Sequence, residues 1–178
     1  FVVLLFREPL PFSVGMPSLR RRLLKVGLAI GAFHVASLTV GGLFSGFGLS
    51  PYGMNAAAMA LNLVAVAVSL VVIERARAHF ISAFSRDKAA FGVLLAGLGF
   101  AAASLPLLGL VNAGSQQEAV GLLGGEWIPL LSQHILASFM VYLGGPAPAI
   151  AYRGTVEAFY WLSPVLPDLS WGLKSLIG

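Results

Sequence analysis

Hydrophobic residues in this chain form long uninterrupted runs instead of the one-sided spacing of an amphipathic helix. Residues 23–47 contain a single charged residue, Lys25, and residues 55–73 and 89–111 contain none. A helix of about 20 residues crosses a hydrocarbon core about 30 Å thick. We therefore expect each of these runs to be a transmembrane helix.

The second half of the chain is less regular. Residues 127–143 are apolar but short, and they carry Pro129, Ser132, Gln133 and His134. This run either just crosses a bilayer or belongs to a broken, re-entrant element shielded by protein. Residues 149–162 read as a helix with charged residues opposite aromatic ones, which is typical of a helix lying at the membrane interface.

These elements predict the fold class and the organisation of the chain. Because backbone polar groups must be satisfied internally in lipid, we expect an all-α, polytopic transmembrane helix bundle with about four main spans plus the interfacial helix. Residues 1–22 would hold the end of an upstream span and a basic cytoplasmic linker. A three-span bundle would follow over 23–111, and 112–178 would hold the irregular fourth span, the interfacial helix and the start of a further span.

Two glycine pairs lie in the first long run. Gly27 with Gly31, and Gly42 with Gly46, each have the GxxxG spacing that lets a second helix approach closely. Glycine is also common in transmembrane helices that make no such contact. The sequence leaves the two interpretations open.

The composition indicates that lipid surrounds much of this chain, and it argues against nucleic acid as a partner. The chain is 58% hydrophobic and 10% charged, whereas soluble domains carry about a quarter charged residues. The net charge of +4 comes from basic residues at the ends of the apolar runs, so we expect the lipid bilayer as a partner and no nucleic acid. The absence of cysteine excludes disulfides, thiolate metal sites and a cysteine nucleophile.

Lysine and arginine alternate between the connections. They occur in residues 7–25, 74–88 and 151–174, and are absent from 48–54 and 112–126. The positive-inside rule then places the first three segments in the cytoplasm of a multi-pass protein of the cytoplasmic membrane. This pattern requires residues 127–143 to cross the bilayer, and it sends a final span outward from near Trp171.

Glu74 is a candidate functional carboxylate, because carboxylates within membrane helices are often functional. It lies at the inner end of the second span, and Arg77 is three residues further on, at ion-pair spacing. Position 75 is Arg, so the diacidic motif of prenyl-peptide intramembrane proteases is absent. We favour a structural ion pair, with Arg153 as a second partner and Glu157 close to it at the same level.

His34 and His134 lie inside apolar runs, where histidine can bind a metal or relay protons. Neither has a His, Asp or Glu three or four residues away within its run, which is the ligand spacing of helical zinc motifs. We therefore favour neutral, hydrogen-bonded histidines. The sequence also lacks the GxSxG, P-loop and GxGxxG motifs, so we assign no catalytic, cofactor-binding or metal-binding residue.

A set of phrases, taken in order, resembles the membrane-spanning region of long signal peptidase I proteins of archaea and some clostridia. The phrases are Met16-Pro17-Ser18-Leu19-Arg20-Arg21-Arg22, Ser50-Pro51-Tyr52, Glu74-Arg75-Ala76-Arg77, Gly144-Gly145-Pro146, and residues 152–161 and 163–171. The resemblance covers most of the chain.

This resemblance implies a serine endopeptidase domain outside the cytoplasmic membrane, which removes signal peptides from exported preproteins. The chain would anchor that domain and receive the apolar segment of the signal peptide. The family's serine motif is missing here, so the resemblance transfers no catalytic residue and leaves open whether the chain belongs to an enzyme. The alternative is a non-enzymatic polytopic scaffold or a transporter subunit, in which Glu74, His34 and His134 adjust helix packing or proton movement.

Overall fold

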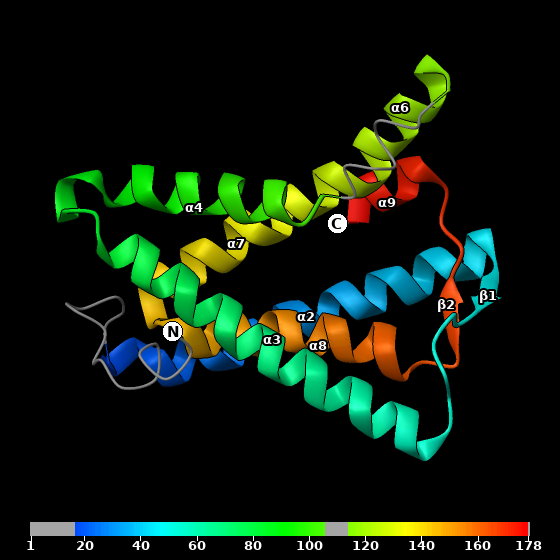
Figure 1. Ribbon diagram of the computed structural model, residues 1–178, viewed down its shortest axis with the longest axis horizontal. Helices are drawn as coiled ribbons and strands as arrows, with labels where there is room; N and C mark the ends of the chain where they lie inside the picture. The colour runs from blue at the N-terminus through cyan, green and yellow to red at the C-terminus, as the bar shows by residue number, and fades with distance from the viewer. Residues whose placement is uncertain (1–16, 106–113, 178) are drawn as a thin grey trace.

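The computed structural model describes residues 17–105 and 114–177, and these are almost entirely helical (Figure 1). The elements in chain order are α2 (Pro17–Ser45), β1 (Phe47–Leu49), α3 (Ala56–Ser82), η1 (Arg86–Lys88), α4 (Ala89–Ala103), α6 (Gln116–Leu122), η2 (Leu123–Trp127), α7 (Ile128–Gly144), α8 (Pro146–Leu162), β2 (Val165–Pro167) and α9 (Trp171–Ile177). The prediction of an all-α fold is confirmed. Within the described residues, the two short strands β1 and β2 are the only β-structure.

Three helical stretches are long and apolar enough to cross a membrane. They are Leu19–Ser45, Ala56–Ser82 and Gln116–Gly144. The first covers most of the predicted run 23–47, the second begins with the predicted run 55–73 but continues nine residues further to Ser82, and the third joins α6, η2 and α7. The third predicted run, 89–111, is helical over Ala89–Ala103, and residues 106–113 lie outside the described part.

Local sequence explains where the helices begin and end. Asn55 caps α3, since its Oδ1 accepts a hydrogen bond from the backbone N–H of Ala58 at 2.8 Å. Gly46, with φ of 100°, follows the end of α2, and Gly145, with φ of 76°, separates α7 from α8. These positive φ values favour glycine, so the chain turns where the sequence places it.

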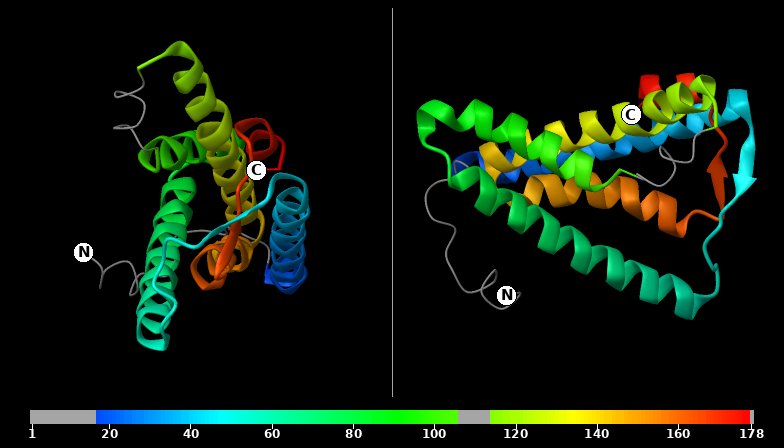
Figure 2. Two further views of the ribbon diagram at one scale, coloured as in Figure 1. Left: turned by 90° about the vertical axis from the view of Figure 1, so that its right-hand side faces the viewer. Right: turned by 45° about the horizontal axis from the view of Figure 1, so that its top comes forward.

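The Gly27–Gly31 pair is a true packing contact, and it locates α8. A Cβ on Gly27 would lie 2.5 Å from the carbonyl oxygen of Pro148, and one on Gly31 would lie 2.8 Å from that of Tyr152. Helix α8 therefore runs beside α2 in the same direction, and Figure 2 shows it between α2 and α3. Gly42 instead packs against the side chains of Phe47 and Pro167, so the second glycine pair makes no helix–helix contact.

The interfacial helix expected over residues 149–162 is not what the structure shows. Helix α8 lies inside the bundle, with Pro148, Ala149, Tyr152 and Val156 buried. The prediction rested on Arg153 and Glu157, which lie four residues apart and opposite aromatic side chains, a pattern typical of the interface. Arg153 instead pairs with the buried carboxylate of Glu74 at 2.9 Å, so α8 can carry this charge while it packs within the bundle.

The strands change the predicted sidedness of the last segment. β1 and β2 pair antiparallel, with Leu49 opposite Val165, and the rings of Tyr52 and Trp161 stack with centroids 3.9 Å apart. Residues 163–167 thus lie at the same end of the molecule as 47–52. The expected placement of 151–174 on the side of 74–88 is therefore wrong for residues 163–167, although Arg153 does lie at the level of Glu74. The charge count of the sequence could not show that α8 carries the chain from that level to the opposite end.

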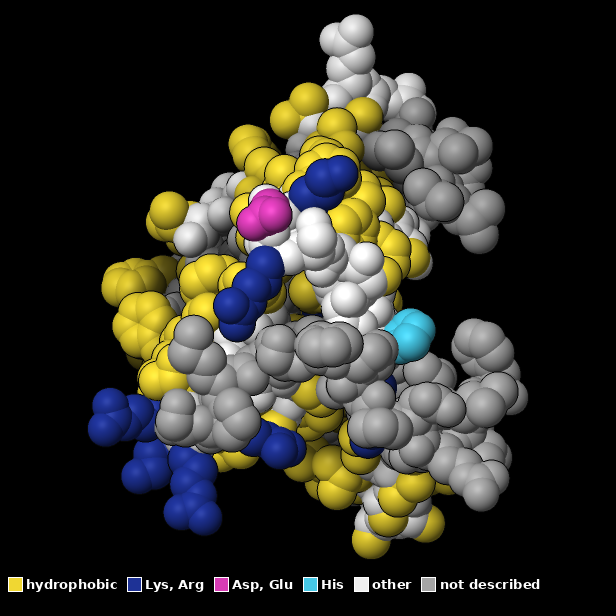
Figure 3. All heavy atoms as spheres, turned by 90° about the vertical axis from the view of Figure 1, so that its left-hand side faces the viewer, with side chains coloured by type: hydrophobic (Ala, Val, Ile, Leu, Met, Phe, Trp, Pro, Cys, Tyr) yellow, Lys and Arg dark blue, Asp and Glu magenta, His cyan; other side chains and the backbone are white. Residues whose placement is uncertain are grey.

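The two ends of the molecule differ in charge. Helices α2, α4 and α8 begin at one end, where Figure 3 shows several lysine and arginine side chains. We call this the basic end and define it by its exposed cations, which are Arg20, Arg21, Arg22, Lys25, Arg86 and Lys88. The connections at the opposite end, 46–55 and 163–170, contain no lysine or arginine.

Candidate functional site

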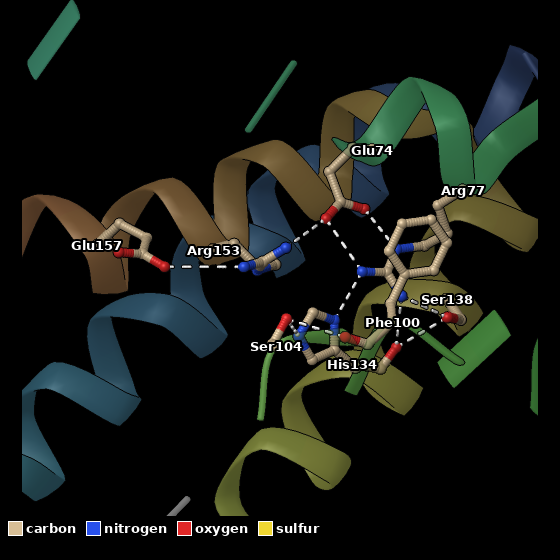
Figure 4. Close-up of polar contacts among 8 residues, drawn as sticks. All are labelled: Glu74, Arg77, Phe100, Ser104, His134, Ser138, Arg153 and Glu157. Atoms are coloured by element: carbon tan, nitrogen blue, oxygen red, sulfur yellow. Dashed lines mark hydrogen bonds and ion pairs between the residues drawn. The ribbon is translucent and has the colours of Figure 1, made fainter. Parts of the chain in front are cut away.

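A cluster of polar side chains lies in the core where helices from distant parts of the sequence meet (Figure 4). Its members come from α3, α7 and α8 and from the residue after α4. They are Glu74, Arg77, Ser104, His134, Ser138 and Arg153, with Glu157 at the edge. The surrounding core is formed by small and aliphatic residues of the same helices.

Glu74 is the centre of this cluster. Its side chain is fully buried, yet both carboxylate oxygens are paired. Oε2 accepts a hydrogen bond from Nε of Arg77 at 2.9 Å, and Oε1 accepts one from Nη1 of Arg153, also at 2.9 Å. A buried charge requires such pairing, because the loss of hydration is otherwise uncompensated. Both expected partners of Glu74, Arg77 and Arg153, are present, and the two distances are equal, so neither comes first.

Arg77 connects α3 to α7. It is 0% exposed, and its guanidinium carbon lies 4.4 Å from the centre of the Phe100 ring. Nη1 donates to the backbone oxygen of His134 at 3.0 Å and to Oγ of Ser138 at 2.8 Å. Nη2 lies 2.8 Å from Nδ1 of His134. The planar fork of donors thus satisfies one carboxylate and three groups of α7.

The contact with Arg77 determines the tautomer of His134. A guanidinium only donates hydrogen bonds, so Nδ1 of His134 must accept, and the ring proton of a neutral imidazole is then on Nε2. Nε2 lies 3.2 Å from Oγ of Ser104, which in turn donates to the backbone oxygen of Phe100 at 2.9 Å. His134 is therefore a neutral, hydrogen-bonded histidine in this geometry, as the sequence favoured.

Arg153 extends the network toward the surface. Its Nη2 lies 3.7 Å from a carboxylate oxygen of Glu157, whose side chain is 34% exposed. Trp161 Nε1 donates to the other oxygen of Glu157 at 3.3 Å. Two arginines are thus balanced by two glutamates, one buried and one half-exposed, and the cluster carries no net charge.

The structure brings together five of the six candidate residues. His34 lies apart from the others: it is 7% exposed and faces Tyr152, with ring centroids 6.4 Å apart. The two histidines do not meet, and the described residues contain no group of three or more His, Cys, Asp or Glu side chains arranged to hold a metal ion.

Two members of the cluster, Ser104 and Ser138, and the adjacent Phe100 were not identified from the sequence. Ser138 was detectable, since it lies four residues after His134 on an apolar helix. Residues at that spacing share a helix face. Ser104 and Phe100 gave no signal, because only the packing of α4 on α7 brings them to the histidine.

The cluster contains a serine next to a histidine, but the hydrogen bonds oppose nucleophilic catalysis. A serine nucleophile needs a ring nitrogen that accepts its proton. Nε2 of His134 already carries the proton, because Nδ1 is occupied by the Arg77 donor. In a catalytic triad, a carboxylate contacts the ring nitrogen of histidine that faces away from the serine. Here Arg77 occupies that position, so the arrangement holds helices together and does not activate Ser104.

Sequence and structure comparisons identify no relative of known function. No family model, curated protein or solved structure matches this chain.

Proposed function

We propose that this chain is the membrane-embedded domain of a signal-peptidase-like protein. It would anchor a serine endopeptidase domain outside the cytoplasmic membrane, where signal peptides are removed from exported preproteins. The proposal rests on the resemblance of the sequence phrases, and one structural observation supports it. The phrases that carry the resemblance are far apart in the chain but contact one another in the fold.

Three contacts make this observation concrete. Glu74, in the third phrase, pairs with Arg153 at 2.9 Å. Tyr52, in the second phrase, stacks on Trp161. Strand β2 belongs to the last phrase and pairs with β1, just before Ser50. A sequence pattern whose members hold the bundle together is expected of a family-specific membrane fold, because these contacts constrain one another.

We further propose a multi-pass topology with the basic end in the cytoplasm. The three crossing-length stretches are the main spans, and α4 and α8 each run from the basic end toward the opposite end, which completes the alternation (Figures 1 and 2). The positive-inside rule supports this orientation. Residues 163–170 then lie on the outer side, where the proposed peptidase domain would act.

The described residues would contribute anchoring and no chemistry to this reaction. Ser104 and Ser138 donate to backbone oxygens, and neither contacts a free base. The test is to purify the intact protein that carries this chain from membranes in neutral detergent and to incubate it with a preprotein bearing a signal peptide. We expect cleavage after the signal peptide, and a Ser104→Ala variant should cleave equally well. An intact protein without this activity would overturn the proposal.

A non-enzymatic scaffold or transporter subunit is the second candidate, and the buried network favours the scaffold. Arg77 lies between His134 and Glu74 and remains protonated, so it interrupts proton movement between them. In sealed proteoliposomes with an imposed pH gradient, we expect the intact protein to leave the rate of proton leakage unchanged. Accelerated leakage that Glu74→Gln abolishes would instead support a transport role.

A further inference from the structure

Two helices at the basic end begin with cations. Arg20, Arg21, Arg22 and Lys25 lie within the first three turns of α2, which has no acidic residue in its first turn. Arg86 and Lys88 form the η1 turn directly before α4. The N-terminus of a helix carries partial positive charge, so cations are unfavourable there and anions are favourable. Arg20 in the first turn of α2, and Arg86 and Lys88 directly before α4, therefore carry the sign of charge that a helix N-terminus disfavours.

Among the described residues, these cations form no ion pair, in contrast to other cations of the chain. Arg77, Arg153 and Lys174 each form an ion pair with a glutamate. None of the ion pairs formed within residues 17–105 and 114–177 involves the six cations of the basic end. Asp87 is the one carboxylate among them. Within the described residues, no ion pair therefore offsets the repulsion among these cations.

Exposed apolar side chains lie next to the cations on the same helices. Leu24 and Val26 on α2 are 36% and 45% exposed, and Phe91 at the start of α4 is 59% exposed. One crossing-length stretch begins at Leu19 and another ends at Ser82, so the cations lie where a span meets the bilayer surface. A partner for this surface needs negative charge next to apolar chains.

We propose that the basic end binds the headgroups of anionic phospholipids, whose phosphates would contact the cations while their acyl chains cover the neighbouring apolar residues. An anionic headgroup would also interact favourably with the partial positive charge at the start of the helical segment that η1 and α4 form together. Juxtamembrane clusters of lysine and arginine bind anionic leaflets by the same electrostatics. This inference is independent of the proposed peptidase activity.

The test measures thermal stability of the intact protein in neutral detergent with added lipid. Phosphatidylglycerol should raise the unfolding temperature and phosphatidylcholine should not, because a ligand that binds the folded state stabilises it. In the variant R20Q/R21Q/R22Q/K25Q, the phosphatidylglycerol concentration needed for half of the effect should rise by about tenfold or more. The variant R20K/R21K/R22K keeps the charge and should behave as the wild type.

Two further measurements separate the possible outcomes. About 0.5 M salt should remove most of the stabilisation of the wild type by phosphatidylglycerol, since it screens charges beyond a few ångströms. This measurement uses the wild type alone, so it does not depend on whether the glutamine variant folds. Glycerol 3-phosphate at the same concentration should have no effect. Equal stabilisation by glycerol 3-phosphate, by phosphatidylcholine, or in the glutamine variant would overturn the proposal.

Discussion

At the scale of single residues, the charge network shows how a charged side chain becomes part of a core. Glu74 and Arg77 are both 0% exposed, and their charges are tolerated because each has hydrogen-bonded partners. Removing one member of a buried pair leaves the other charge without compensation, which costs more than the pair itself contributes. Individual residues of this cluster should therefore differ sharply in their importance according to burial.

Glu74→Gln should lower the stability of the protein. The substitution leaves Arg77 and Arg153 without their shared counter-charge inside the bundle, a loss of about 3–5 kcal/mol for buried pairs. The unfolding temperature in neutral detergent, compared with that of the wild type, measures this loss of stability. Proteolytic turnover of an attached peptidase domain, measured well below the unfolding temperature, should be retained. Lost turnover with unchanged thermal stability would make Glu74 a functional residue.

Glu157→Gln is the matched comparison for Glu74. Glu157 contacts the same Arg153, but at 3.7 Å and with a side chain that is 34% exposed. Solvent screening reduces such pairs to about 0–1 kcal/mol. We expect its unfolding temperature to stay close to that of the wild type, and a loss as large as that of Glu74→Gln would contradict the central position of Glu74.

The tautomer of His134 is a separate prediction that does not depend on stability. Because Arg77 donates to Nδ1, nitrogen NMR of the ¹⁵N-histidine-labelled protein in lipid should show a neutral ring protonated at Nε2. His134→Gln removes the signal and so assigns it among the three histidines. A His134 signal protonated at Nδ1 would show that the Arg77 contact is absent.

At the scale of elements, the contact of α2 with α8 depends on the missing side chains of Gly27 and Gly31. Both would place a Cβ under 3 Å from backbone oxygens of α8. A backbone oxygen cannot move aside as the end of a flexible side chain can. Close packing of these helices therefore requires glycine, and the contact brings Arg153 to the depth at which it meets Glu74.

Gly27→Ala should destabilise the protein even though alanine is the better helix former. The added methyl group would overlap the Pro148 oxygen at 2.5 Å, and overpacking of this kind costs about 1–3 kcal/mol. Thermal unfolding in detergent measures the change. Gly99→Ala is the control, since a Cβ there meets nothing within 4 Å. It should leave stability unchanged or raise it by up to about 1 kcal/mol. Equal effects of the two substitutions would argue against the α2–α8 contact.

At the scale of the whole molecule, the short ladder joins two connections that are more than a hundred residues apart. It brings residues 47–49 and 165–167 together at the end opposite the cations. In the proposed topology this end faces the oxidising side of the membrane. The ladder therefore offers a joint test of fold and orientation in a chain that has no cysteine of its own.

The double substitution Leu49→Cys with Val165→Cys should form a disulfide in intact cells without added oxidant. The two residues are direct partners across an antiparallel ladder, where the distance between α-carbons suits a disulfide, and disulfides persist on the oxidising side of a membrane. A shift in mobility on a non-reducing gel reports it. Leu49→Cys with Ser85→Cys should not cross-link. A pair that forms only after cell lysis and oxidation would keep the fold but reverse the orientation.

The sequence by itself determined that the chain is helical and that several of its helices are long and apolar enough to cross a membrane. Long runs with at most one charged residue predicted α2 and α3, because a helix is the only single segment that satisfies all its backbone hydrogen bonds in lipid. Asn55 and Gly145 marked boundaries by local backbone chemistry. The ion pair of Glu74 with Arg77 was also predictable, since residues three apart on a helix are neighbours.

Only the tertiary structure decided where α8 lies and what its charges do. The sequence showed Arg153 and Glu157 on a helix with aromatic residues, a pattern that fits an interface as well as a bundle with a buried carboxylate. The choice depended on Glu74, which is 79 residues away from Arg153, and on glycines of α2 that leave room for α8. Such long-range pairing leaves no local pattern, so the buried network and the strand ladder became visible only in three dimensions.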